Sequence, residues 1–427
     1  MILQKPDELT EPLLRLDDPD AGPSDEPPPP SFEESASHVL IDFDQGGALV
    51  PSGGEAPPPQ FEPYNAEHWV SSDQSSIISH DPHLNKDGEA LYRFLLSQAR
   101  TPPTYIVHIQ GVHVERRSRL VTTKDRHGHS RTETEYYNET VTDFDFKIDL
   151  SQHVPSYATQ WTVGDDEPTY RGKMKCEIGL PGATRKPEKA EARVFDSWQL
   201  ERVKRGLPPW IGLQQSIVHG DNRVAMQERH EVLKSSWTLR QWADDYCGSN
   251  KVFKEFVYEK VVYGWSTEAL ENAILTLVRT THYTGDVTVN FRPSHNKIII
   301  RPDTHLSRML SNGWWKFFLI ITLIYPFIWL FQHFHSRGGG RWTVGGGAYA
   351  LKSWEIPTEA DNHERNIVQT EAGPRKLVGI KEGQWFKAWE GTIRSSVLAK
   401  KIDPVPAYAP ASLTHSITAS MLDGYRA

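Results

Sequence analysis

The organisation of this chain depends on one stretch of sequence, Phe317-Phe-Leu-Ile-Ile-Thr-Leu-Ile-Tyr-Pro-Phe-Ile-Trp-Leu-Phe331. It is continuously apolar apart from Thr322, and apolar residues extend it to Trp314 on one side and Phe334 on the other. At about 1.5 Å per residue, a helix of this length extends roughly 30 Å, the thickness of the hydrocarbon core of a bilayer. The sequence therefore predicts one transmembrane helix, residues 314–334, in a single-pass membrane protein.

The flanks of this segment carry the residue types that border membrane spans. Tryptophan favours the interface between lipid and water, lysine can extend its ammonium group to the headgroups, and arginine collects just beyond a span. We therefore assign seven residues to the membrane region: Trp314, Trp315, Lys316, Pro326, Trp329, Arg337 and Arg341. Pro326 lies in the middle and should kink the helix. A re-entrant hairpin, with both ends on one side of the bilayer, is the alternative.

Charge does not fix the orientation of the segment. Three basic residues lie on each side of it: Arg301, Arg308 and Lys316, then Arg337, Arg341 and Lys352. The amino terminus has no apolar core of signal-peptide length, so we expect the large amino-terminal region to be cytosolic and the carboxy-terminal part to cross. The expected location is an endomembrane such as the endoplasmic reticulum. In this topology the sequon Asn138-Glu-Thr140 stays unmodified.

Residues 1–64 differ in composition from the rest of the chain. They contain 14 acidic residues and two basic ones, a net charge of −12, whereas the whole chain has a formal charge of −8. They also contain 13 of the 30 prolines. Such sequence buries too little apolar surface to fold, which predicts a disordered acidic tail. The apolar island His38–Asp44 is a candidate docking motif within it. Residues 403–427 are predicted to be a second disordered tail.

Residues 65–305 read as an α+β region of one or two domains, with a mixed, largely antiparallel sheet and several helices. The clearest signal is the alternation of Phe144, Phe146, Ile148 and Leu150 with charged residues, which predicts a half-buried strand. Its partner in a long antiparallel hairpin is Tyr105–Glu115. The other expected elements are helices at 87–99, 187–205, 238–246 and 267–280, a strand at 254–263, and a hairpin of strands 286–291 and 297–301.

Residues 338–402 are expected to form a juxtamembrane Gly-rich loop and an amphipathic helix. The loop is Gly338–Gly347, which lacks the Gly-Lys-Ser/Thr ending of a P-loop and the spacing of a dinucleotide-binding fingerprint. In the helix, Trp385 and Trp389 lie on one apolar face beside basic residues, so they are candidate membrane or partner contacts. Packing of this face against the protein's own domain is the alternative. Trp210 and Ile211, in an apolar Pro-Pro-Trp-Ile loop, are candidates of the same kind.

The sequence contains no local motif for catalysis, for a cofactor or for a metal. The serine-hydrolase elbow, the His-Glu-x-x-His motif and paired Cys-x-x-Cys motifs are all missing, and the two cysteines allow no disulfide framework. His127 and His129 with His108 or His113 form a weak candidate metal site, for which a solvated turn is the simpler reading. No focused basic patch indicates nucleic-acid binding.

Four stretches resemble a family of uncharacterised fungal single-pass membrane proteins: Tyr137–Phe146, Phe256–Trp265, Leu323–Leu330 and His335–Trp342. The resemblance covers roughly residues 80–400, and it implies no established activity or site. Some members carry an ABC-transporter label. This sequence does not support that label, because it has one predicted span and no Walker motif.

These observations favour a non-enzymatic, membrane-anchored interaction or adaptor protein. Its expected partners are the lipid bilayer and other proteins, which would bind the acidic tail or the α+β region. A membrane-bound enzyme or lipid-handling protein with a site in the α+β region is the first alternative. An accessory subunit of a larger membrane complex is the second.

Overall fold

The computed structural model describes residues 65–71, 73–124, 130–180, 183–212, 235–355, 357, 367–370 and 373–410. The chain divides into two units, 1–63 and 64–427, and all described residues belong to the second. The predictions for the tail 1–64, for the docking motif His38–Asp44 and for most of the tail 403–427 therefore lie outside the described residues. The fold class is α+β, as predicted.

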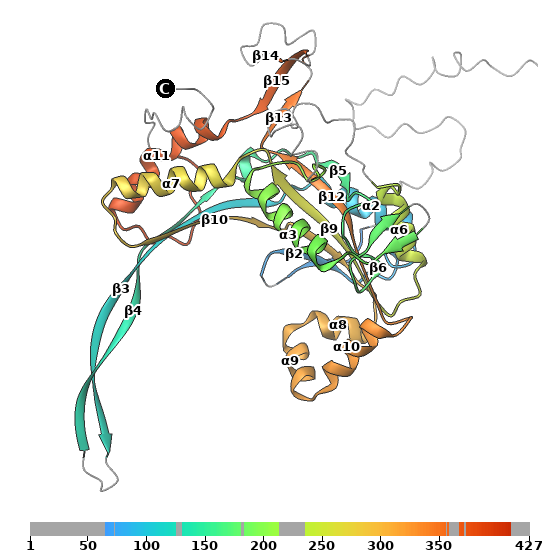
Figure 1. Cartoon of the computed structure of the whole chain (residues 1–427), viewed down its shortest axis with the longest axis horizontal. Helices are drawn as coiled ribbons and strands as arrows, with labels where there is room; N and C mark the ends of the chain where they lie inside the picture. The colour runs from blue at the N-terminus through green and yellow to red at the C-terminus, as the bar shows by residue number, and fades with distance from the viewer. Residues whose placement is uncertain are drawn as a thin grey trace, which may run out of the picture. The chain divides into compact units, whose positions relative to one another are not determined.

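A seven-stranded mixed sheet forms the centre of the described unit (Figure 1). Its order is β1-β2-β11-β9-β12-β5, with β6 also pairing with β12. The pairing of β11 with β2 and of β12 with β9 is parallel, and the other pairings are antiparallel. The strands are β1 (Trp69–Val70), β2 (Ser76–Ser79), β5 (Thr159–Thr162), β6 (Arg171–Lys173), β9 (Phe253–Tyr263), β11 (Lys297–Ile300) and β12 (Gly339–Ala350).

Helices cover both faces of this sheet because side chains alternate along β9. Phe256 and Tyr258 are buried in a cluster with α2 (Gly88–Ala99) and α6 (Leu239–Gly248). On the opposite face, Val261 and Tyr263 pack with Trp198 of α3 (Lys189–Lys204). The predicted strand and all four predicted helices of this region are confirmed within one or two residues at most ends.

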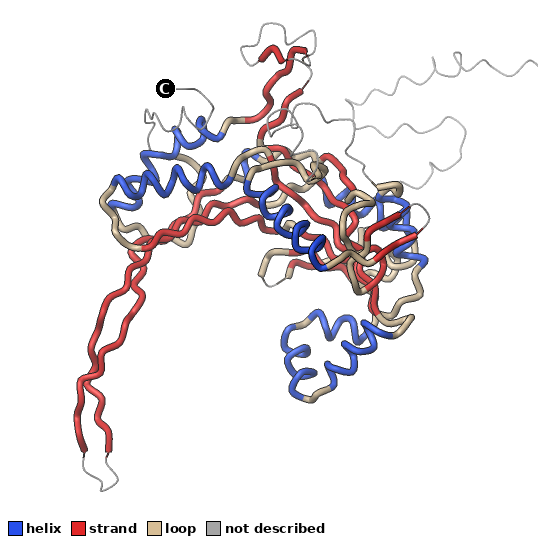
Figure 2. Tube along the Cα trace, viewed as in Figure 1, coloured by secondary structure: helices blue, strands red, loops and turns tan. Residues whose placement is uncertain are grey.

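A second sheet, β10-β3-β4, contains the predicted long hairpin. Its strands are β3 (Thr104–Lys124), β4 (Ser130–Asp149) and β10 (Asp286–Ser294). Their buried residues share one core with α7 (Thr267–Thr280) and α11 (Glu382–Leu398). Strand β10 pairs with β3 only as far as Val112, so the outer parts of β3 and β4 continue as a two-stranded ribbon (Figure 2).

The predicted hairpin of strands 286–291 and 297–301 is wrong. The two strands are adjacent in sequence, but β10 pairs with β3, whereas β11 pairs with β2 and β9. The backbone of His295 has a φ of 56°, and its N–H and that of Asn296 bond to the carbonyls of Gln74 and Ser75. The turn therefore passes the chain from one sheet to the other. Smaller elements are η1 (Ser151–His153), the pair β7 (Ile178–Leu180) and β8 (Ala183–Arg185), and the sheet of β13 (Lys352–Glu355), β15 (Gly373–Gly379) and β14 (Ile367–Thr370).

The predicted boundary at residue 305 does not hold, because the chain after the apolar segment returns to the same fold. The Gly-rich stretch expected to be a loop is β12, a central strand that pairs with β9 along its length. Its glycines let the neighbouring backbone approach closely: a Cβ at Gly346 would overlap the carbonyl of Glu259. The expected amphipathic helix exists as α11, but it packs against α7 in the core.

The single helix predicted for residues 314–334 is also wrong. Two helices, α9 (Gly313–Ile321) and α10 (Ile324–Phe334), follow α8 (His305–Ser311) and are bent by 104° relative to each other. Pro326 explains where the helix breaks, since a proline clashes with the carbonyl four residues earlier, here that of Thr322. Leu323, next in the chain, has a left-handed φ of 57°. Among the described residues no single helix could span a membrane, although this bent pair has sufficient length and apolar composition.

The close packing of β12 gives a testable prediction. Gly346→Ala should lower the free energy of unfolding by about 1–3 kcal/mol, because the added methyl meets backbone that cannot move aside. Gly248→Ala is the matched control, since nothing lies within 4 Å of a Cβ at that position. Chemical denaturation of the two variants in detergent would measure the difference. Equal stability would contradict the assignment of residues 339–350 to the centre of the sheet.

Candidate functional site

The helix pair α9–α10 presents a large apolar surface, which we call the apolar hairpin (residues 313–334). Trp314, Phe327 and Phe334 are 81%, 72% and 77% exposed. The other large apolar side chains exposed on it are Trp315, Phe317, Phe318, Ile320, Ile321, Leu323, Ile324, Trp329 and Leu330. Apolar surface of this extent marks a site of contact with a membrane or a protein partner.

The structure separates the residues that the sequence assigned to the membrane region. Trp314, Trp315, Pro326 and Trp329 lie exposed on the apolar hairpin, and Arg337 is exposed just after it. Lys316 also belongs to the hairpin. Arg341 does not flank a span, because it lies within β12.

The four candidate contacts outside this segment are buried. Trp385 and Trp389 are 1% and 2% exposed and share the core of α7 and α11, so the alternative of packing within the protein's own domain is the correct one. Trp210 and Ile211 are buried against Trp198. Their apolar character serves the core, and they offer no surface to lipid or partner in this structure.

Hydrogen bonds hold both ends of the apolar hairpin to the central sheet. On the amino-terminal side, the His80 ring contacts the Pro302 carbonyl at 2.8 Å and the Ser311 hydroxyl at 3.0 Å. Burial lowers the pKa of His80, so the ring is neutral at pH 7. On the carboxy-terminal side, the backbone N–H of Phe253 donates to Gly338, and the Phe253 and Phe331 rings lie 6.2 Å apart.

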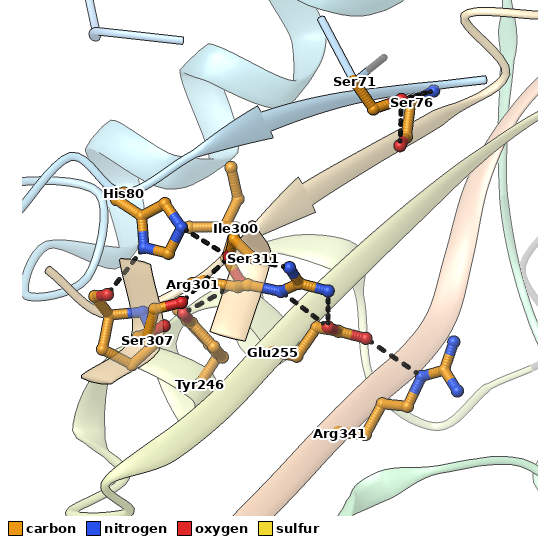
Figure 3. A network of polar contacts seen from close by, with 11 residues as sticks. Ser71, Ser76, His80, Tyr246, Glu255, Ile300, Arg301, Ser307, Ser311 and Arg341 are labelled. Atoms are coloured by element: carbon orange, nitrogen blue, oxygen red, sulfur yellow. Dashed lines mark hydrogen bonds and ion pairs between the residues drawn. The ribbon is translucent and has the colours of Figure 1, made fainter. Parts of the chain in front are cut away.

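A charged network joins this attachment to the sheet (Figure 3). Arg301 donates two hydrogen bonds to one oxygen of Glu255, at 2.9 and 2.7 Å, and a third to Ser311 at 2.9 Å. The other oxygen of Glu255 lies 3.4 Å from Nε of Arg341. One carboxylate on β9 therefore serves two guanidinium groups, one following β11 and one on β12.

A cleft of about 210 Å³ lies between this network and the apolar hairpin. Its walls come from β9, β12, α8, the hairpin and the residues that directly follow β6 and β11: Met174, Phe253, Lys254, Glu255, Arg301, Ser307, Leu310, Lys316, Tyr325, Gln332, Gly340 and Arg341. Four of these side chains are cationic and only Glu255 is anionic. The cleft therefore carries a cationic excess, which suits an anionic ligand.

Lys254 is the most deeply placed of the four cations. It is buried, and its ammonium group donates to the carbonyls of Asn85, Tyr246, Cys247 and Ser249 at 2.8–3.2 Å. Burial lowers its pKa. Lys254 therefore binds the end of α6 to the sheet, and its hydrogen bonds are already used.

Two of the four histidines of the candidate metal site, His108 and His113, lie among the described residues. His108 contacts Asp145 at 2.7 Å and His113 contacts Asp143 at 2.6 Å, so each ring pairs with a different carboxylate. His127 and His129 lie outside the described residues. No group of three metal-ligating side chains occurs among the residues searched, which are the described ones. Asp143 also binds Lys400 and Tyr283, and its hydrogen bond from Lys400 is the main reason that its pKa falls to about 2.

Sequence reasoning did not find Glu255, His80 or the cleft itself. In the sequence, Arg301, Lys316 and Arg341 are recognisable only as charges that flank a predicted span. No local pattern pairs them, because the order of strands in the sheet brings them to one cleft. Known proteins give no guide to the cleft either: no family model, no curated protein and no solved structure matches this chain. The resemblance to a fungal membrane protein family stays a prediction.

The shared carboxylate gives a second prediction. Glu255→Gln should destabilise the fold by about 1–3 kcal/mol, because two guanidinium groups then face each other without a counter-charge. Asp303→Asn removes a carboxylate from the exposed pair with Arg308 and should cost less than about 1 kcal/mol. Thermal and chemical denaturation of both variants would compare them. An effect of Glu255→Gln no larger than that of the control would show that the network does not hold the sheet.

Proposed function

We propose that this protein is a non-enzymatic, membrane-anchored interaction protein whose apolar hairpin enters one leaflet while the α+β body stays on one side of the membrane. The observation that carries the proposal is the hairpin itself, a helix pair with a dozen exposed large apolar side chains between two strands of one sheet. Exposure of this surface to water is costly, at roughly 25 cal/mol for each Å² of apolar area.

The order of strands in the sheet supports a re-entrant anchor, which enters and leaves the bilayer on the same side. Strand β11 precedes the hairpin and β12 follows it, and both pair with β9. Ile300 at the end of β11 lies opposite Phe256, and Gly339 at the start of β12 lies opposite Phe253. A single span would place β12 on the opposite side of a bilayer from β9 and β11, and would break the pairing of β12 with β9. The re-entrant alternative is compatible with the sheet.

Helix length supports the same arrangement. At about 1.5 Å per residue, α9 and α10 extend roughly 14 and 17 Å, about half of a bilayer core of roughly 30 Å. Trp314 and Trp315 lie at the start of α9, where an interfacial position suits indole rings. The body and its acidic tail then face the cytosol at an endomembrane.

The outer ribbon of β3 and β4 supports the interaction role. Beyond Val112 and Thr142 it has no further strand at either edge among the described residues, and Leu120 and Tyr136 are exposed on it. Free strand edges are templates for pairing with another chain. The same ribbon would serve an accessory subunit of a membrane complex. A lipid-handling role finds its support in the cleft beside the hairpin.

Polar substitutions on the apolar hairpin test whether it anchors the protein in a membrane. The triple variant Phe317→Ser, Ile321→Ser and Phe327→Ser should move most of the protein from the membrane pellet to the soluble fraction after a carbonate wash. The three side chains together contribute roughly 5–9 kcal/mol when buried in lipid. The control is Val194→Ser, Leu200→Ser and Leu398→Ser, which changes equally exposed apolar residues of α3 and α11. Retention of both variants in the pellet would refute the anchor.

A further inference from the structure

We infer that the cationic cleft at the base of the apolar hairpin binds the phosphate group of an anionic membrane lipid. This inference rests on the proposed function, because the lipid's acyl chains would lie beside the hairpin. It adds a ligand class and a site: Arg341 of β12 and Lys316 of the hairpin both line the cleft, and they are the groups that contact the phosphate.

Two of the four cations of the cleft are not available to a ligand. Lys254 donates to four carbonyls, and Arg301 has its hydrogen bonds to Glu255 and Ser311. Both side chains serve the internal structure. Their charges nevertheless add to the positive potential of the cleft, because the single carboxylate of Glu255 offsets only one of them.

Arg341 is the cation whose bonding is incomplete. Its Nε is buried and has no hydrogen-bond partner within the described part of the chain, and the ion pair of 3.4 Å with Glu255 lacks hydrogen-bond geometry. The guanidinium carbon lies 5.1 Å from the centre of the Tyr170 ring, a cation–π contact that holds the group in place. Figure 3 shows its two terminal nitrogens directed away from Glu255. A planar guanidinium can bind a phosphate through its two terminal nitrogens.

Lys316 completes the site from the hairpin side. Its ammonium group lies 5.7 Å from the centre of the Tyr325 ring, and among the described residues no carboxylate pairs with it. It directly follows Trp314 and Trp315, so in the anchored protein it lies at the level of the lipid headgroups. Lysine near a membrane surface attracts anionic lipid.

The size and position of the cleft fit a headgroup. Its volume of about 210 Å³ holds several waters at roughly 30 Å³ each, which a phosphate ester can displace. The hairpin supplies Lys316, Tyr325 and Gln332 to the lining, so part of the wall is the element that enters the bilayer. Ser307 and Tyr325 add hydroxyl groups, which can donate to phosphate oxygens.

The test uses the full chain in a neutral detergent, with thermal unfolding as the readout, because a ligand that binds only the folded state raises Tm. The probes are dihexanoylphosphatidic acid, dihexanoylphosphatidylcholine and inorganic phosphate. Phosphatidic acid should raise Tm in a saturable way, and the zwitterionic lipid should not. The double variant Arg341→Gln with Lys316→Gln should weaken the apparent affinity at least tenfold. Arg308→Gln, a charge change beside the cleft in a residue paired with Asp303, should leave it within twofold.

The single variant Lys316→Gln is the alternative test if the double variant folds poorly. Lys316 is exposed, and its replacement removes only one contact with an aromatic ring, so this variant should fold. It should weaken the affinity at least threefold. An equal response to both lipids, unchanged affinity in these variants, or an equal shift with inorganic phosphate would overturn the headgroup site. None of these results would affect membrane anchoring, which is tested separately by the membrane pellet assay of the wild-type chain and the triple variants.

Discussion

The pairing of β11 and β12 with the same strand, β9, is the constraint on which the rest of the structure depends. Residues 301–338, between these two strands, must leave the sheet and return to it at one end. The apolar hairpin therefore begins and ends beside the first residues of β9. The shared carboxylate of Glu255 lies at this place, with one arginine from each side of the hairpin. Sheet topology, the charged network and the cleft are thus three consequences of one connection.

This connection also explains the break between the helices. A straight apolar helix from residue 314 to 334 would end roughly 30 Å from its start. The chain would then be far from the place beside β9 where β12 begins. Pro326 prevents a continuous helix at Thr322, and the left-handed Leu323 turns the chain back. In the sequence, Pro326 predicts a kink in a membrane span. In this fold, the helix break at Pro326 lets the chain return to the sheet.

Much of the α+β body could be predicted from local patterns. Alternation along β4, the apolar stripe of α7 and the caps of α2 and α6 are local signals, and these elements appear where the patterns place them. Strand β12 could not be predicted in this way, because its glycines carry no apolar alternation and are explained only by the close approach of β9. The location of Trp385 and Trp389 could not be predicted either, because the sequence shows that a helix has an apolar face but not what covers that face. The site depends on residues from distant strands and was beyond local reasoning.

Topology mapping in microsomes tests the central account most directly. Asn138 provides a natural glycosylation acceptor in the exposed outer ribbon, and a second acceptor can be introduced at Tyr408, which is also exposed. A fused signal peptide that forces the chain into the lumen provides the control that both acceptors are competent. Without it, the account predicts that neither acceptor is glycosylated, because it places the residues before and after the hairpin on the cytosolic side. Modification of the acceptor at 408 alone would mean that residues 313–334 cross the bilayer once, and it would contradict the account.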